Sequence, residues 1–218
     1  MARNKYPEQT VEQILSASAK LFIENGYEKT TIQDIMDELK LSKGAIYHHF
    51  KSKEEILNAV LNKRSIYVKE MLDDLIKNTK AENAREKLKK ILISSVTDRE
   101  AHAIDLILSS QIKSPQFVVS GLQSNVNEDA SIISKLLLEG IKDGSIKTEY
   151  PDECAEIFML LLNIWTNPVL FSRNLFETEK RLKFLQQMMR QLGIDIVSDE
   201  LIENTMKGYS NMKGFKEE

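Results

Sequence analysis

The chain has 218 residues, of which 42% are hydrophobic and 29% charged, so it can bury the core of an ordinary globular protein. Eight Gly and four Pro are too few for a many-stranded sandwich or barrel, which needs a turn about every ten residues. The formal net charge of −3 argues against a chain that binds nucleic acid over its whole surface. A helical protein with few connections is the class that remains.

Redox and metal chemistry are not expected. Cys154 is the only cysteine, so it cannot form an internal disulfide, and the fitting compartment is a reducing one. Three histidines, His48, His49 and His102, do not make a zinc-ligand pattern with it. The first ten residues lack the apolar core of a signal peptide, and the longest uncharged run, residues 157–172, is too short and too polar to span a bilayer. We therefore expect a cytoplasmic protein without metal or cofactor.

Short amphipathic helices are predicted at the start of the chain and longer ones after it. Each early helix follows a Ser or Thr that can cap it, namely Thr10, Thr31, Ser42 and Ser52. The expected helices cover residues 11–25, 32–39, 43–50, a long segment from Ser52, then 84–97, 101–112, 115–142 with a break near Gly121, 151–167, 178–192 and part of the last twenty residues. The fold class is therefore all-α.

The segment from Lys40 to Lys53 differs from the rest of this acidic chain, because it carries four Lys, two His and no acidic residue. On charge alone, a solvated surface is a competing interpretation. Two short helices joined by a short turn, however, form a helix-turn-helix, which lays its second helix in the DNA major groove. On a helical wheel, Ile46 and Phe50 face the core, and Gly44, Ala45, Tyr47 and His48 face outward, with Lys43 at the tip.

The run TTIQDIMDELKLSKGAIYHHFKSKEEIL, residues 30–57, resembles the N-terminal helix-turn-helix of the TetR (tetracycline repressor-like) family. The resemblance rests on the capping Thr31, the two Ile residues of the second helix, Leu-Ser-Lys-Gly at the turn and Ile-Tyr-His-His-Phe on the recognition helix. Two positions depart from the family pattern: Lys40 stands where Gly is usual, and Met36 where Ala is common. Beyond about residue 65 only the all-helical plan is similar.

The resemblance implies a homodimeric transcriptional regulator, usually a repressor, that leaves a palindromic operator when a small molecule enters its C-terminal domain. It implies a DNA-binding domain over residues 1–53 and a ligand-binding and dimerisation domain over residues 54–218. By position, the groove-facing residues are Lys43, Gly44, Ala45, Tyr47 and His48, with which we group the cap Ser42. Thr31, His49 and Lys53 match phosphate contacts. For Tyr47 a partly buried structural role is an alternative, and for His49 packing against the first helix.

Candidate ligand-binding residues lie in the C-terminal part. Aromatic and Met side chains at helical spacing, together with one polar residue in an apolar run, would line an apolar cavity: Phe117, Phe158, Met159, Asn163, Trp165, Phe171 and Phe184. His102 and Asp105, three residues apart on one helix, form a polar pair that a ligand could contact. Plain core packing and an ordinary surface pair are the competing interpretations.

A dimer surface is expected on the helix over residues 178–192. Leu182, Leu185, Met189 and Leu192 recur at steps of three and four residues, while Phe184 and Met188 lie on another face. A helix with two apolar faces packs against its own core and against something else. The family forms a dimer bundle from its last two large helices, and by resemblance we assign residues 152–167 and 178–192 to it.

The predicted function is that of a ligand-responsive DNA-binding repressor, nucleoid-associated when bound to DNA, and not an enzyme. Its expected partners are a palindromic double-stranded operator, a largely apolar small-molecule effector and a second copy of the chain. One alternative is a protein of the same fold that a protein partner controls. The other is an enzyme with an appended helix-turn-helix, against which stands the lack of a Gly-rich phosphate loop or a nucleophile motif in the sequence.

Overall fold

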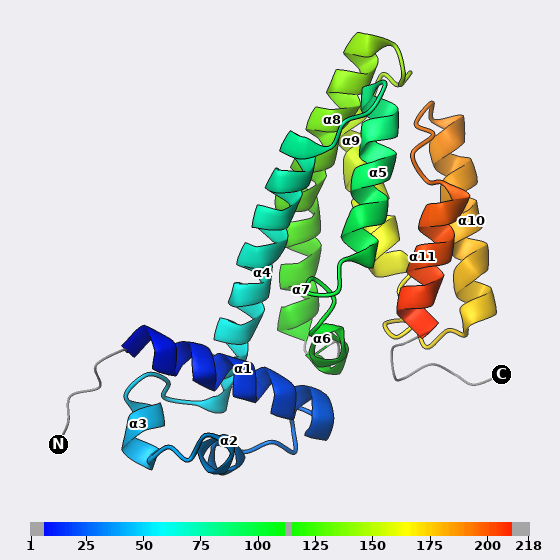
Figure 1. The fold of residues 1–218 in the computed structure, drawn as a ribbon. Coiled ribbons are helices and arrows are strands. Elements are labelled where there is room, and N and C mark those ends of the chain that lie inside the picture. The colour runs from blue at the N-terminus through cyan, green and yellow to red at the C-terminus, as the bar shows by residue number, and fades with distance from the viewer. Residues whose placement is uncertain (1–6, 112–114, 211–218) are drawn as a thin grey trace. The chain divides into compact units, whose positions relative to one another are not determined.

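The computed structural model describes residues 7–111 and 115–210, and every regular element in these ranges is a helix (Figure 1). The helices are α1 (Pro7–Asn25), α2 (Ile32–Leu39), α3 (Lys43–Tyr47), α4 (Lys53–Asn78), α5 (Ala84–Thr97), α6 (Asp105–Gln111), α7 (Pro115–Ser124), α8 (Ala130–Asp143), α9 (Pro151–Leu160), α10 (Leu175–Gln191) and α11 (Asp199–Ser210). Two π-helical segments, Asn125–Asp129 and Leu161–Trp165, follow α7 and α9. The predicted all-α class is confirmed. None of the helices in the described ranges has the length and apolar character needed to cross a bilayer.

Some helix boundaries differ from the prediction. The first helix begins at Pro7, so Thr10 is a buried residue inside α1 rather than its cap, and Pro is a favoured residue at the start of a helix. The recognition helix ends at Tyr47 instead of residue 50. α10 begins before residue 178, because Asn174 and Glu177 form a capping box there. The break predicted near Gly121 is not found there, because α7 continues through Gly121 to Ser124 and the π-helical segment begins at Asn125.

The chain divides into two compact units. Of the described residues, the N-terminal unit comprises 7–71 and Ala103–Ser110, and the C-terminal unit comprises Leu72–His102, Gln111 and 115–210. The predicted domain limit at residue 53 coincides with the start of α4. The part of α4 up to Met71 nevertheless groups with the N-terminal unit, because Ile56, Leu57 and Val60 are buried in the core of that unit.

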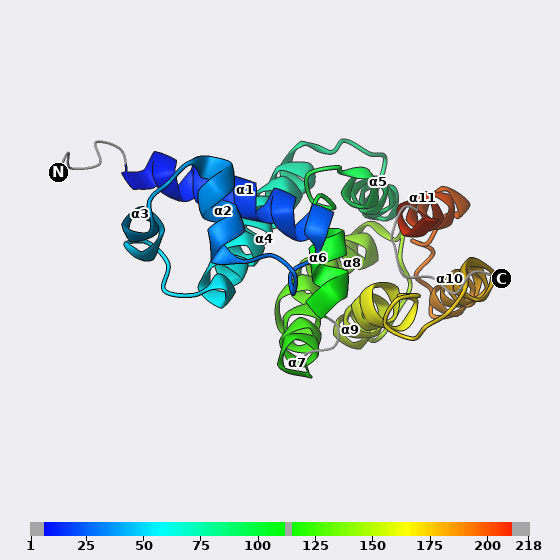
Figure 2. The ribbon, with the colours of Figure 1, turned by 90° about the horizontal axis from the view of Figure 1, so that it is seen from below.

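The N-terminal unit is built on a small apolar core. Ile14 of α1, Ile35 of α2, Ile46 of α3 and Ile56 of α4 have no exposed surface, and α6 adds Ile107. α2 packs against both α1 and α3, as the views in Figures 1 and 2 show. Burial of Ile35 and Ile46 in this core holds α2 and α3 in place, since isolated helices of this length are unstable in water.

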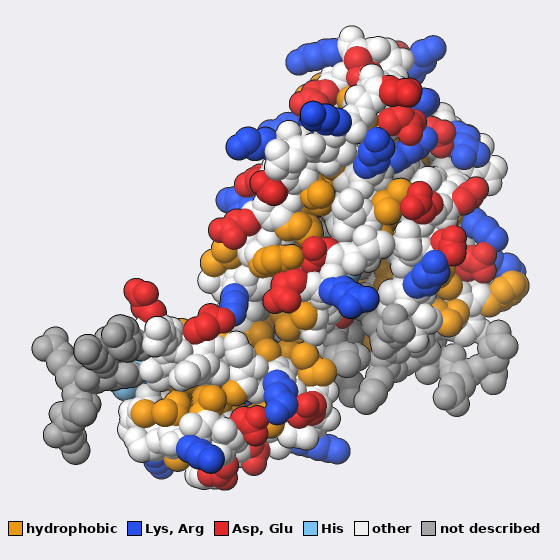
Figure 3. All heavy atoms as spheres, viewed as in Figure 1, with side chains coloured by type: hydrophobic (Ala, Val, Ile, Leu, Met, Phe, Trp, Pro, Cys, Tyr) orange, Lys and Arg blue, Asp and Glu red, His pale blue; other side chains and the backbone are white. Residues whose placement is uncertain are grey.

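The C-terminal unit is a helical bundle. α5 packs against α8 and α11, α8 packs against α9, and α10 packs against α11 (Figure 2). Its core includes Leu88, Leu137, Phe158, Leu185 and Met189, all of which are fully buried. Acidic and basic side chains intermix over the face of this unit seen in Figure 3, in keeping with a small net charge.

Candidate DNA-binding interface

The start of α2 is fixed by a reciprocal cap. The main-chain N–H of Asp34 donates to Thr31 Oγ1 at 3.2 Å, and the main-chain N–H of Thr31 donates to the Asp34 carboxylate at 2.8 Å. The Thr31 hydroxyl also donates to that carboxylate, and these bonds hold the pKa of Asp34 below its ordinary value. The predicted capping role of Thr31 is confirmed, and this exposed residue lies at a helix N-terminus, where an anion is favoured.

The turn between α2 and α3 passes through a left-handed residue. Lys40 has φ 53°, and the N–H of Leu41 donates to the carbonyl of Met36 at 3.0 Å. This conformation is the one that favours Gly, and a residue with a Cβ adopts it at a cost of about 1 kcal/mol. Lys40 thus retains the turn geometry associated with Gly at this position.

The recognition helix α3 is anchored by one cap and two apolar side chains. The N–H of Ala45 donates to Ser42 Oγ at 3.3 Å, which confirms Ser42 as the cap. Ile46 is fully buried and Phe50 is 9% exposed, so both face the core as predicted. After Tyr47 the chain continues as a turn in which the N–H groups of His49 and Phe50 donate to the carbonyl of Ile46.

The opposite face of α3 is open to solvent. Lys43, Gly44, Tyr47 and His48 are exposed, and Ala45 and His49 are half-buried. Tyr47 is 42% exposed, with the Lys43 ammonium 5.6 Å from its ring, so it is a surface residue and not a core tyrosine. A Cβ added to Gly44 would meet no atom within 4 Å. This face can enter a groove and offers donors, an aromatic ring and a side-chain-free backbone to a base edge.

The Lys53 ammonium is hydrogen-bonded within the chain. It donates to the carbonyls of Tyr27 at 2.7 Å and Glu28 at 3.3 Å, and lies 4.3 Å from the centre of the Tyr27 ring. The side chain therefore ties the α1–α2 connection to the first turn of α4. His49 stacks edge-on against His48, with ring centroids 4.9 Å apart, and so keeps a partly exposed position beside the open face of α3.

The predicted ligand-binding residues differ widely in burial. Phe158 is fully buried in the core, Met159 packs against that core, and Phe171 is 44% exposed beneath the Arg173 guanidinium. Phe117 lies on α7 and is half-buried. His102 is exposed, with Nε2 3.2 Å from the carbonyl of Ser95 in the C-terminal unit, whereas Asp105 begins α6 in the N-terminal unit.

Two of these residues have partners that the sequence did not predict. Asn163, in the second π-helical segment, donates to Asn125 Oδ1 at 2.7 Å, and Asn125 donates in turn to the carbonyl of Gly121. Trp165 packs edge-on against Phe184, with ring centroids 5.9 Å apart. The Asn pair joins two irregular segments far apart in the sequence, so no local spacing could have signalled it.

Three of the four residues predicted for the dimer surface lie inside the chain. Leu182, Leu185 and Met189 are at most 1% exposed, because this stripe of α10 faces the core of its own unit. Leu192 remains 42% exposed. The outward face of α10 instead carries Phe176 and Phe184, which are 57% and 55% exposed.

Comparison with known proteins agrees with the geometry of α2 and α3. Residues 14–60 match the family model of bacterial regulatory proteins of the tetR family. The chain is 28% identical to the HTH-type transcriptional repressor KstR2 of Mycolicibacterium smegmatis over 66% of this chain and 70% of that protein. It is 30% identical to the fatty acid metabolism regulator protein of Bacillus subtilis over 62% of this chain and 70% of that protein.

A solved structure extends the likeness to both units. A transcriptional regulator of Saccharomonospora viridis, solved in complex with choline, superposes with a TM-score of 0.60 at 23% identity, covering 84% of this chain and 96% of that one. The likeness in fold therefore reaches well beyond residues 14–60, although the sequence match to the family model stops there. The chain belongs to the TetR family and is a helix-turn-helix transcriptional regulator, not an enzyme.

Proposed function

We propose that the chain is a homodimeric repressor that binds a palindromic operator and leaves it when a small molecule occupies the C-terminal unit. The observation that carries the proposal is the face of α3, where Lys43, Gly44, Tyr47 and His48 are exposed while Ile46 holds the helix to the core. Residues 1–53 would bind DNA, and residues 54–218 would bind the effector and form the dimer.

The proposed roles within the interface follow from exposure. Residues of the α3 cap and open face would read bases in the major groove: Ser42, Lys43, Gly44, Ala45, Tyr47 and His48. The N-terminus of α2 at Thr31 and the side chain of His49 would meet phosphates, which fix the register without reading sequence. Lys53 would act indirectly, by holding the Tyr27 carbonyl and so the entry to α2.

The proposed dimer surface is the outward aromatic face of α10. Phe176 and Phe184 are more than half exposed, and the Lys180 ammonium lies 4.3 Å from the Phe176 ring. Ile157 of α9 is also 43% exposed. Aromatic side chains are enriched at protein interfaces, and two recognition helices of a dimer must lie about 34–36 Å apart, or a multiple of that, to reach successive major grooves.

The proposed effector is a largely apolar small molecule. The relative named as a fatty acid metabolism regulator and the choline complex of the Saccharomonospora viridis regulator support small molecules with apolar parts. The residues proposed to contact it belong to the C-terminal unit and lie on α7, α9 and the segments that follow α9: Phe117, Phe158, Met159, Asn163, Trp165 and Phe171. Such a ligand releases DNA only if it binds the non-operator state more tightly.

The test is a footprint of the full chain on DNA from upstream of its own gene, at several salt concentrations. We expect protection of an inverted repeat and an affinity that falls steeply with salt. Fatty acids of increasing length and choline are then added to the complex, with Trp165 fluorescence as a second readout. If the chain protects no site at low salt, either upstream of its own gene or elsewhere in genomic DNA, the DNA-binding proposal is contradicted. A footprint that none of the added molecules alters would contradict the effector class alone.

A further inference from the structure

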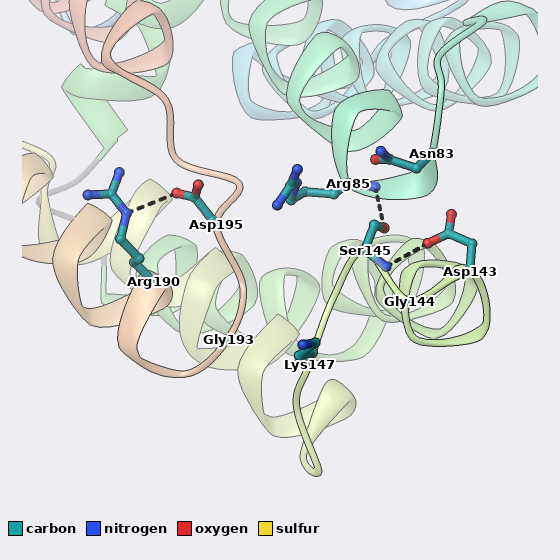
Figure 4. A pocket seen from close by; sticks show the side chains of 9 residues that line it. All are labelled: Asn83, Arg85, Asp143, Gly144, Ser145, Lys147, Arg190, Gly193 and Asp195. Atoms are coloured by element: carbon teal, nitrogen blue, oxygen red, sulfur yellow. Dashed lines mark hydrogen bonds and ion pairs between the residues drawn. The ribbon is translucent and has the colours of Figure 1, made fainter.

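The C-terminal unit carries a polar groove of about 570 Å³ that none of the proposed roles uses (Figure 4). Three parts of the chain line it: the start of α5, the end of α8 with the loop after it, and the end of α10 with the loop after it. Its lining residues are Asn83, Arg85, Asp143, Gly144, Ser145, Lys147, Arg190, Gly193 and Asp195. None of the predicted ligand-binding residues is among them.

The walls of the groove are held together by main-chain hydrogen bonds. The N–H of Lys147 donates to the carbonyl of Gly193 at 3.1 Å and joins the two loops. The N–H of Ala84 donates to the Asp143 carboxylate at 2.7 Å, and the N–H of Arg85 donates to Ser145 Oγ at 3.2 Å. The first turn of α5 is thus bonded to the loop after α8, so the groove is formed before any ligand arrives.

The Asp143 carboxylate takes part in these hydrogen bonds. Its carboxylate accepts from the main-chain N–H groups of Ala84 and Ser145, and hydrogen bonding to Ser145 is the main reason that its pKa lies below the ordinary range. Each of its two oxygens therefore already accepts a main-chain N–H. The nearby guanidinium of Arg85 adds a smaller lowering of the same pKa.

The remaining charges leave the groove cationic in an acidic chain. Glu86 is shared between Arg85 at 3.2 Å and Lys89 at 3.1 Å, and Asp195 is shared between Arg190 at 3.2 Å and Lys89 at 3.9 Å. Lys147 forms no ion pair with any described residue. Figure 4 shows the Arg85 guanidinium in the space between Asp195 and Ser145. Arg85 is bonded to Glu86 through Nε, which leaves its terminal nitrogens available to an incoming group, whereas Figure 4 shows those of Arg190 pointing away from Arg85.

We propose that this groove binds the phosphate group of a small phosphorylated metabolite. A dianionic phosphate would accept from the terminal nitrogens of Arg85 and would give Lys147 the counter-charge that it lacks. Guanidinium groups recognise phosphate oxygens with two parallel bonds, and an ammonium group adds a point charge. The proposal concerns a site in the C-terminal unit alone and does not depend on operator binding or on the apolar effector.

The test is calorimetric titration of the full chain with inorganic pyrophosphate, without DNA. We expect saturable binding and a rise in the melting temperature that potassium chloride of equal ionic strength does not reproduce. Lys147→Gln and the double variant Arg85→Gln with Lys147→Gln should bind progressively more weakly, by about tenfold for each charge-assisted bond lost. Lys135→Gln is the matched control, because Lys135 is an exposed lysine of α8 outside the groove, and its affinity should equal that of the wild type.

Two results would overturn the proposal. One is a wild-type chain that shows no heat and no thermal shift beyond the chloride control. The other is pyrophosphate binding that the double variant retains at wild-type strength. The single variant Lys147→Gln shows whether weaker binding comes from misfolding. The Lys147 side chain is exposed and has no partner among the described residues, so its replacement should leave the fold intact.

Discussion

The ammonium of Lys53 donates a hydrogen bond to the main-chain carbonyl of Tyr27 at 2.7 Å, across 26 positions of the chain. The same ammonium lies over the Tyr27 ring, so one side chain secures both the connection before α2 and the start of α4. This lysine of the basic segment next to the recognition helix therefore has a structural contact, and we expect its effect on DNA binding to run through the fold.

We expect Lys53→Ala to lower the stability of the chain by about 1 kcal/mol, the contribution of an ordinary intramolecular hydrogen bond. Operator and random DNA should both bind more weakly, with the slope of log affinity against log salt unchanged, because no phosphate contact is lost. Lys43→Ala is the matched comparison: its exposed ammonium lies on the open face, so the melting temperature should hold, and operator binding should weaken more than binding to random DNA. A reduced slope for Lys53→Ala would place its ammonium on DNA after all.

Lys40→Gly should raise the melting temperature. Lys40 has φ 53°, a conformation that costs a residue with a Cβ about 1 kcal/mol and glycine almost nothing, although glycine returns part of this gain through its more flexible unfolded state. Lys40→Ala keeps the Cβ and removes the same charge, so it should leave the melting temperature near that of the wild type. Thermal unfolding followed by circular dichroism distinguishes the two variants, and equal effects would mean that backbone strain at residue 40 is negligible.

The N-terminal unit was the more predictable part of this chain, because its signals are local. A capping residue such as Thr31 or Ser42 acts on N–H groups within three positions, and the burial of Ile46 and Phe50 follows from helical periodicity in a single short segment. The bond from Lys53 to Tyr27 could not be predicted in this way. It depends on how the chain returns after α3, and no spacing within the motif encodes that path.

The C-terminal unit shows a second limit of periodicity. The spacing of Leu182, Leu185 and Met189 correctly marks an apolar stripe, but spacing does not say whether a stripe faces the core or a partner. The inward stripe of α10 is aliphatic, and the outward face carries Phe176 and Phe184. The polar groove is likewise invisible to local patterns, since its lining comes from three separate segments that meet only in the folded unit.

The cap at the start of α2 should make stability depend on pH. Because the pKa of Asp34 is lowered by its bonds to Thr31, this carboxylate stabilises the folded state fully above its ordinary value of 3.8, and the contribution is lost as the pH falls through the lowered pKa. The melting temperature of Asp34→Ala should therefore lie below that of the wild type at pH 6 and approach it in strong acid. Asp37→Ala controls for the loss of one negative charge from α2. A gap that widens on acidification would have the wrong sign for this cap.

Phe184→Glu should convert the proposed dimer to a monomer. Phe184 is 55% exposed and packs against Trp165. A carboxylate at this position would lose its hydration in the interface. Removal of an aromatic anchor raises the dissociation constant of a dimer by about thirtyfold or more. Light scattering after size exclusion reads the mass directly. Ile66→Glu changes another exposed apolar residue, on α4, and should remain dimeric. A dimeric Phe184→Glu chain would move the interface away from this face of α10.

Alanine substitutions at two glycines of the C-terminal unit distinguish the cost of backbone strain from the cost of a steric clash. Gly144 and Gly193 have nearly the same φ, 78° and 80°, so replacement by alanine should strain either backbone by about 1 kcal/mol. A Cβ at residue 144 would meet nothing within 4 Å, whereas a Cβ at residue 193 would lie 1.8 Å from the carbonyl oxygen of Lys147.

The loop after α8 and the loop after α10 are joined by the hydrogen bond from Lys147 N–H to the Gly193 carbonyl, and Gly193→Ala must push them apart. We therefore expect Gly193→Ala to lower the free energy of unfolding by about 2 kcal/mol more than Gly144→Ala does. Urea unfolding of the two variants measures this difference. Equal losses would show that the loops separate at no cost, and the groove between them would then not be a preformed feature of the unit.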